Sequence, residues 1–130
     1  MLNFLFKNNS LSFASPGDSI YVGLATAVSA AETGSVTEAS FGAYARQQVA
    51  AASWTTIGAD STDTQTAKNT SAIEFPAKTD SGNVTITHVF IVDASSSGNI
   101  LFVGALDASK TLAQNDIFRI NTNNLSIELK

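Results

Sequence analysis

His88 is the single histidine of the chain, so any histidine-based general base or metal site has to be built on it. It lies beside Thr87 and Val89 in an alternating stretch, and no second histidine is within reach. We therefore expect a structural histidine that is hydrogen-bonded between strands, rather than a catalytic or metal-binding residue.

Asp60 and Asp63, with Asn69 nearby, offer the oxygen ligands that a hard cation prefers. Their spacing matches no calcium-binding loop, and the bidentate glutamate that would follow such a loop is missing. A solvated loop is the expected structure here, and we predict no metal site.

Two carboxylates, Asp93 and Glu74, could in principle converge as they do in a glycosidase. Carboxylates at strand ends more commonly cap turns, and this is the role that we expect for Asp93. Arg46 and Arg119 are the only arginines, and a pair between one of them and a carboxylate such as Asp93 would be structural. No serine lies in a G-x-S-x-G motif and no glycine-rich phosphate loop is present. The sequence thus predicts no catalytic residue, no cofactor, no small-molecule substrate and no enzymatic activity.

The composition points to a β-rich protein with a polar but weakly charged surface. Only 14% of the 130 residues are charged, against roughly 25% in an average globular domain. Such a surface is usual for extracellular or virion proteins and unusual for a cytosolic enzyme. The net charge of −4 and the lack of a Lys/Arg cluster disfavour binding to nucleic acid, and the absence of cysteine excludes disulfides and thiolate metal sites.

The N-terminal segment, residues 1–13, is expected to form an apolar arm or a short helix. It is too short for the apolar region of a signal peptide and lacks basic residues before it, so we expect no cleaved export signal. No window reaches the length of a membrane span, and we predict no membrane partner. The arm either packs on its own domain or docks on a neighbouring subunit through four apolar side chains: Leu2, Phe4, Leu5 and Phe6.

A β-hairpin over residues 83–106 is the strongest folding signal. Two runs of β-branched and bulky apolar residues flank a stretch of turn formers from Asp93 to Gly98. The connection is too long for a two-residue turn, and Gly98 is free to take a positive φ. We expect the remaining strands to add to this pair.

The rest of the chain reads as short strands separated by turns and loops. We predict strands at 19–25, 41–49 with a continuation to Trp54, 72–76, 117–120 and 125–129. We predict surface loops at 26–40, with one helical turn near 30–33, and at 58–71, and turns at 78–82, 107–109 and 115–116. Seven or eight short strands without a long helix predict an all-β fold: a single antiparallel β-sandwich, jelly-roll-like, over residues 14–130.

Several segments, in this order and spacing, resemble a family of small tailed-bacteriophage virion proteins. They are 21–26, 42–47, Trp54, 72–76, 85–93, 98–106, 116–120 and 125–129. Members are often labelled tail-fibre proteins, and similar β-sandwich proteins serve as capsid cement or decoration subunits. The resemblance covers roughly residues 19–129 and carries over no catalytic residue. It departs at the start, where family members carry a longer amphipathic helix, and in the loop at 26–40.

The resemblance and the composition together imply a non-enzymatic structural protein on the exterior of a virion that is assembled in the host cytoplasm. Our main hypothesis is a capsid cement or decoration subunit, a homo-oligomer that binds the major capsid protein and stabilises the outer lattice. The alternatives are a tail fibre or baseplate component, or a carbohydrate-binding module that stacks sugars on Trp54, Tyr21 or Tyr44. The apolar arm is the expected contact surface, with weaker expectations for the loops at 26–40 and 58–71.

Overall fold

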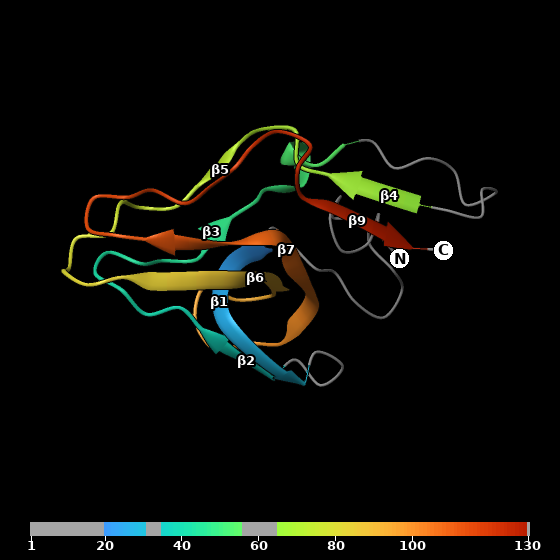
Figure 1. Ribbon diagram of the computed structural model, residues 1–130. Coiled ribbons are helices and arrows are strands. Elements are labelled where there is room, and N and C mark those ends of the chain that lie inside the picture. Colours follow the sequence, from blue (N-terminus) through green and yellow to red (C-terminus); the bar gives the residue numbers. More distant parts are fainter. Residues whose placement is uncertain (1–19, 31–34, 56–64, 130) are drawn as a thin grey trace. The chain divides into compact units, whose positions relative to one another are not determined.

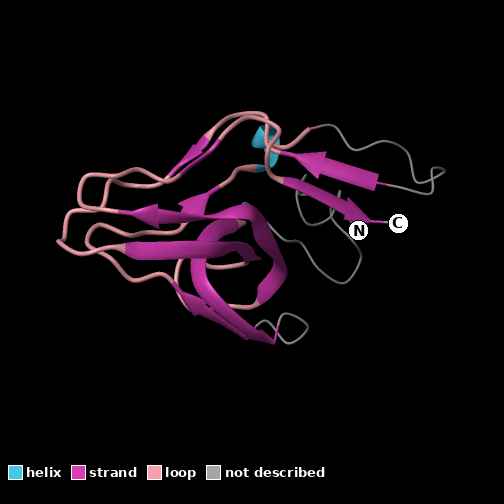
Figure 2. Ribbon diagram, viewed as in Figure 1, coloured by secondary structure: helices cyan, strands magenta, loops and turns pink. Residues whose placement is uncertain are grey.

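The computed structural model describes residues 20–30, 35–55 and 65–129, which form short strands in antiparallel ladders (Figures 1 and 2). In this part of the chain the helical content is one 3-10 turn, Ala51–Ser53. Nine short strands paired in this way are what a β-sandwich is made from, so the predicted all-β, antiparallel fold class is confirmed.

The chain forms two compact units, and each combines segments that are distant in sequence. Of the described residues, the first unit contains Ile20, 49–55, 65–73 and 119–129, and the second unit contains 21–30, 35–48 and 74–118. The apolar arm at 1–13 lies outside the described residues. Its boundary, like the single domain expected over 14–130, stays a prediction.

The larger sheet belongs to the second unit. Its strand order is β2 (Ser35–Glu38), β1 (Tyr21–Ala30), β6 (Val84–Val92) and β7 (Ile100–Leu112), and β3 (Gln47–Gln48) also pairs with β1 (Figure 1). All of these pairs are antiparallel. The predicted hairpin therefore forms one side of this sheet, with β7 as the last strand and β1 added to the other edge of β6.

The hairpin strand β7 is longer than the sequence suggested. The turn predicted at 107–109 is wrong, because β7 continues to Leu112. Its pairing with β6 shifts from Ile86 opposite Lys110 to His88 opposite Ala105. Four residues of β7, 106–109, thus lie opposite Thr87 alone, and a β-bulge absorbs the turn formers without ending the strand.

Two further predictions in the second unit are corrected. The surface loop predicted at 26–40 instead contains the end of β1 and all of β2, which pair from Ala25 opposite Glu38 to Ala30 opposite Ser35; residues 31–34 lie outside the described part. The strand predicted at 41–49 is reduced to Gln47–Gln48 because a turn occupies its first half. The small and polar residues of β2 form a strand because they pair with the more apolar strand β1. The intrinsic strand propensity of β2 does not predict this pairing.

A close approach between β1 and β6 fixes the centre of the sheet. Gly23 lies opposite Phe90, and a Cβ atom at position 23 would overlap the Phe90 ring. Phe90 is 1% exposed and forms a small apolar cluster with Ala25 and Val92. Residues 22 and 24, which point to the other face of β1, are a fully buried valine and leucine. Both faces of the sheet centre are therefore buried.

The first unit contains a two-stranded ladder between β4 (Gln65–Lys68) and β9 (Ser126–Leu129). The closing strand predicted at 125–129 is confirmed, but the exposed loop predicted at 58–71 is wrong from residue 65 onward; residues 56–64 lie outside the described part. Ala67, opposite Ile127, is completely buried. Pairing with an apolar partner strand thus makes a strand of a segment that has no large apolar residue of its own.

The remaining short elements have mixed outcomes. The predicted strands at 72–76 and 117–120 are confirmed as β5 (Ile73–Glu74) and β8 (Arg119–Ile120), which pair with each other. The predicted strand continuation to Trp54 is wrong, because Ala51–Ser53 form the 3-10 turn and Trp54 makes only an isolated bridge to Asn69.

Candidate functional site

The structure joins Arg46 and Glu38 in a bidentate ion pair next to the end of β2. The Arg46 Nε and Nη2 groups donate to the Glu38 Oε1 and Oε2 atoms, each at 2.8 Å. The arginine side chain is 8% exposed and the glutamate side chain 32% exposed. Two parallel hydrogen bonds in this planar geometry fix both side chains in position. A structural arginine–carboxylate pair was expected, but its carboxylate is Glu38 and not Asp93.

Arg46 also holds the connection of the hairpin. Its Nη1 group donates to the carbonyl oxygens of Ala94 and Ser97, both at 2.8 Å. The guanidinium carbon lies 5.4 Å from the centre of the Phe90 ring, within the range of a cation–π contact. Four of the five N–H donors of Arg46 are thus used inside the second unit.

Tyr44 completes the hydrogen bonds around Glu38. Its hydroxyl group donates to Glu38 Oε1 at 2.8 Å and accepts from the Leu24 backbone N–H at 3.0 Å. Its ring is parallel to that of Phe75 at 6.3 Å and meets the Phe41 ring edge-on at 5.2 Å. Burial and the neighbouring Glu38 carboxylate raise the pKa of the Tyr44 hydroxyl well above its ordinary value. Tyr44 therefore stays protonated and acts as a donor toward the carboxylate.

Asp93 closes the connection between β6 and β7. Its Oδ1 atom accepts from the Asn99 backbone N–H at 2.6 Å, and its Oδ2 atom accepts from Asn99 Nδ2 at 3.0 Å. The Asp93 backbone N–H donates to the Asn99 carbonyl oxygen at 3.2 Å. The loop reverses through Ser97 and Gly98, whose φ angles are 53° and 79°. The expected turn-capping role of Asp93 and the positive φ of Gly98 are both confirmed.

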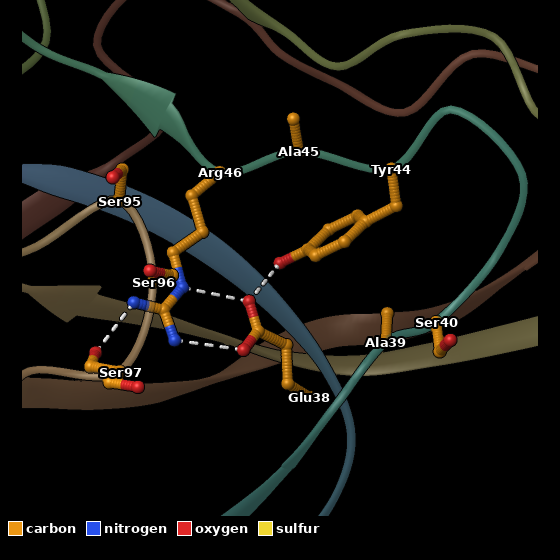
Figure 3. Close-up of a pocket in the computed structure, with 9 residues that line it drawn as sticks. All are labelled: Glu38, Ala39, Ser40, Tyr44, Ala45, Arg46, Ser95, Ser96 and Ser97. Atoms are coloured by element: carbon orange, nitrogen blue, oxygen red, sulfur yellow. Dashed lines mark hydrogen bonds and ion pairs between the residues drawn. The ribbon is translucent and has the colours of Figure 1, made fainter.

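These side chains line an open pocket of about 520 Å³ on the second unit. Figure 3 shows Arg46 between Glu38 and Ser97, with the Tyr44 hydroxyl pointing toward the same carboxylate. The lining consists of Glu38, Ala39, Ser40, Tyr44, Ala45, Arg46, Ser95, Ser96 and Ser97. Apart from the ion pair, the pocket thus presents hydroxyl groups and small side chains.

The charge of the pocket is balanced over a wide pH range. Burial acts to raise the pKa of Glu38, but the hydrogen bonds from Arg46 and Tyr44 and the charge of Arg46 outweigh it and lower that pKa. The hydrogen bond to Glu38 raises the pKa of Arg46. Both groups are therefore ionised at neutral pH, and each neutralises the other.

The single histidine makes a hydrogen bond that differs from the predicted one. His88 lies in β6, half-buried, and its Nδ1 atom shares a hydrogen bond of 2.8 Å with Thr87 Oγ1. This partner is the adjacent residue of the same strand, so the hydrogen bond expected between strands is replaced by a local one. Nothing in the bond prepares the imidazole for proton transfer to a ligand.

Of the three residues considered as ligands of a hard cation, the structure describes Asn69. Asp60 and Asp63 lie outside the described residues. Asn69 is completely buried, and its amide donates to the carbonyl oxygens of Ser71 and Asn121 and accepts from the Leu125 backbone N–H. Its polar atoms are therefore used in the fold and are not available to a cation.

Glu74 and Asp93, considered above as a possible carboxylate pair, and Trp54 do not line the pocket. Glu74 is not among the residues that line it, whereas Asp93 bonds Asn99. Trp54 is 1% exposed, so it cannot stack a sugar ring as the carbohydrate-binding alternative would require. Of the aromatic candidates, Tyr44 alone lines the pocket, and Tyr21 packs against the cluster around Phe90.

Sequence reasoning missed two charged residues that the structure buries or engages. Glu38 lies in the segment expected to be a loop, so its register opposite Ala25 was not foreseeable without β2. Lys78 is 2% exposed, and its ammonium group donates to the Asp80 carboxylate and to the carbonyl oxygens of Asp80 and Ser81. The predicted turn at 78–82 is thus closed by a buried lysine.

Two further classes of site were considered in the described residues. No three histidine, cysteine, aspartate or glutamate side chains there lie close enough together to hold a metal ion. None of the helical structure there is long and apolar enough to cross a membrane.

Comparison with known protein families identifies the family of the chain. A family model described as "Podophage GP4 fiber I protein gp80" matches residues 1–128. Among curated proteins, no sequence matches the chain. The family match includes residues of both units and the residues of the N-terminal arm.

Proposed function

The chain belongs to the Gp80 family of podophage fiber I proteins, and on this basis we propose that it is a fibre subunit on the exterior of a tailed phage. Membership in a phage fibre family makes it a virion structural protein. The observation that carries the fibre proposal is the match over residues 1–128, which includes the arm as well as the strands. The fibre alternative fits the family description better than the capsid cement role that was our main hypothesis.

The described structure supports a role in which the protein holds a fixed shape. The second unit joins its sheet, its hairpin connection and the segment at 38–46 through the ion pair of Arg46 and Glu38. The hydrogen-bonding groups of Arg46, Asp93 and Asn69 are engaged in bonds within the fold. Polar side chains used in this way rigidify a subunit that must transmit force or present a surface.

Attachment to the particle is assigned to the apolar arm. A terminal segment with Leu2, Phe4, Leu5 and Phe6 would leave an apolar patch in water unless a partner or the chain itself covers it. We propose that the arm docks on a neighbouring virion subunit, a second copy of this chain or another structural protein. Fibres are built from repeated copies, so weak contacts of each copy are multiplied.

The position in the particle tests the fibre proposal. Quantitative mass spectrometry of purified virions should give a copy number far below that of the major capsid protein, and antibody labelling should mark the tail region. A copy number close to that of the capsid protein, with label over the whole capsid, would instead establish the cement role. Absence of the chain from purified particles would contradict both.

A further inference from the structure

We propose that the pocket around Arg46 is a binding site for a neutral, hydroxyl-rich ligand, namely an uncharged sugar unit. This inference rests on the proposed fibre role, which places the protein on the particle exterior where a ligand can reach the pocket. The argument itself depends on the charge, the free hydrogen-bonding groups and the fixed geometry of the pocket.

The balance of charge in the pocket selects against charged ligands. Four of the five N–H groups of Arg46 donate hydrogen bonds to Glu38 and to two backbone carbonyl groups. The Glu38 carboxylate receives three hydrogen bonds, two from Arg46 and one from Tyr44. An anionic or cationic ligand would have to compete with a pair that is already satisfied, whereas a neutral ligand leaves it intact.

Free hydrogen-bonding groups remain at the rim of the pocket. The hydroxyl groups of Ser40, Ser95, Ser96 and Ser97 are exposed and bond to no other residue of the described chain. Glu38 Oε2 accepts a single hydrogen bond, from Arg46, so it keeps acceptor capacity on a side chain that is 32% exposed. Hydroxyls that both donate and accept, beside a carboxylate acceptor, match the hydroxyl groups of a sugar ring.

The loop of three serines, residues 95–97, is held in place before any ligand binds. Arg46 fixes the carbonyl groups of Ala94 and Ser97, and Asp93 with Asn99 closes the base of the loop. A ligand that binds here therefore loses little free energy to the ordering of the loop. Three consecutive hydroxyl-bearing residues are thus presented on a fixed backbone.

Hydrogen bonds rather than ring stacking would hold the sugar. Trp54 is buried, and one neighbour of the Tyr44 ring is the parallel Phe75 ring. Without a broad aromatic platform we expect weak binding, with a dissociation constant in the millimolar range. Several copies on one fibre would raise the apparent affinity by multivalency.

The test is an NMR titration of the full chain with single sugars. The neutral probes are glucose, galactose and N-acetylglucosamine, and the charged probes are glucuronate and glucosamine. At least one neutral probe should give saturable shifts of the amide signals of residues 95–97. The double variant Ser95→Ala/Ser96→Ala should weaken that binding about tenfold, since each lost hydrogen bond is worth roughly a factor of three to ten. Ser109→Ala/Ser126→Ala, which changes exposed serines outside the pocket, should leave it unchanged.

Three outcomes would overturn the proposal: no saturable shift with any neutral probe, tighter binding of a charged probe, or equal affinity of the pocket variant and the wild type. The two proposals fail separately, because the titration uses the isolated chain and the fibre role is judged on virions. A chain that binds no sugar but sits in the tail refutes only the pocket, and a sugar-binding chain found on the capsid refutes only the fibre role.

Discussion

Arg46 is the residue on which the second unit depends most directly. Its guanidinium group joins Glu38 to two carbonyl groups of the hairpin connection, a geometry that the single ammonium of lysine cannot reproduce. We expect Arg46→Lys to lower the free energy of unfolding by about 2 kcal/mol, measured by urea denaturation at pH 7. A double-mutant cycle with Glu38→Gln should show strong coupling, and additive effects of the two substitutions would contradict the pair.

The carboxylates of this unit predict a loss of stability in acid. The pKa of Glu38 lies below its ordinary value of 4.5, because the bonds from Arg46 and Tyr44 outweigh burial. The backbone N–H of Asn99 holds the pKa of Asp93 below 3.8. A lowered folded-state pKa stabilises the protein above the ordinary carboxyl range, and this contribution is lost as pH falls through the lowered values.

Urea denaturation at several pH values measures this effect. Near neutral pH, the contribution of Glu38 and Asp93 to the free energy of unfolding should be constant. At pH values below about 4.5, where the carboxyl groups of the unfolded chain begin to take up protons, the free energy of unfolding should decrease. Glu38→Gln should have lower stability at pH 7 and a shallower acid dependence. The same acid dependence in the variant and the wild type would show that Glu38 does not contribute.

Asn69 has the corresponding role in the first unit. Its side chain is completely buried and makes three hydrogen bonds, to Ser71, Asn121 and Leu125. Asn69→Ala should lower the free energy of unfolding by about 2–4 kcal/mol, because one buried and two partly buried hydrogen bonds to backbone groups are lost. Asn124→Ala, at an exposed position of the same unit, is the control and should change it by less than about 0.5 kcal/mol. Equal effects of the two variants would contradict the assigned role.

At the scale of elements, the contact of β1 with β6 is the most sensitive point. Gly23→Ala places a Cβ atom against the Phe90 ring, which is buried and has little room to move. We expect a loss of about 1–3 kcal/mol in thermal or urea denaturation. Gly104 lies opposite Val89 in the same sheet, and a Cβ atom there would meet nothing within 4 Å. Gly104→Ala is thus the matched control, and a loss as large as that of Gly23→Ala would exclude the ring contact as the cause.

The elements that the sequence predicted are those whose own residues carry the signal. The hairpin has two apolar runs and a loop of turn formers, and the closing strand alternates from Leu125 to Leu129. The strands β2 and β4 were missed because they contain small and polar residues, and their apolar neighbours β1 and β9 determine their conformation. The residue types at 106–109 favour a turn as well as a β-bulge, so the sequence predicts a turn where the structure has a bulge.

The candidate site shows the same limit more sharply. Arg46 and Asp93 were identified as residues that form structural contacts, and both do so. Glu38 was not, because its place beside Arg46 depends on the antiparallel pairing of β1 with β2. The pocket also depends on the contact of Arg46 with the loop at 94–97, which lies 48 to 51 residues away in the sequence. Such long-range pairing is a property of the folded sheet and not of any local pattern.

For the whole molecule, the low fraction of charged residues and the resemblance to phage virion proteins agree with the family match over residues 1–128. Composition limits the class of protein because a surface of Ser, Thr, Asn and Ala must be stable without many ion pairs. It does not distinguish a fibre from a capsid protein, since both present such surfaces. The difference between a fibre and a capsid protein depends on where the chain attaches to the particle, and we propose that the arm at 1–13 makes this contact.

Deletion of residues 1–13 should prevent the chain from joining particles while leaving its fold intact. The reason is that, in the docking proposal, Leu2, Phe4, Leu5 and Phe6 would supply the apolar contact area, at roughly 1.5–3 kcal/mol for each fully buried side chain. Phage that carry the truncated gene should release particles with much less of this protein, measured by mass spectrometry. A variant with these four residues changed to serine separates loss of apolar contact from loss of length. If the truncated chain has normal thermal stability and is incorporated as well as the full chain, the arm does not mediate attachment, and the contacts must lie on the strands and loops.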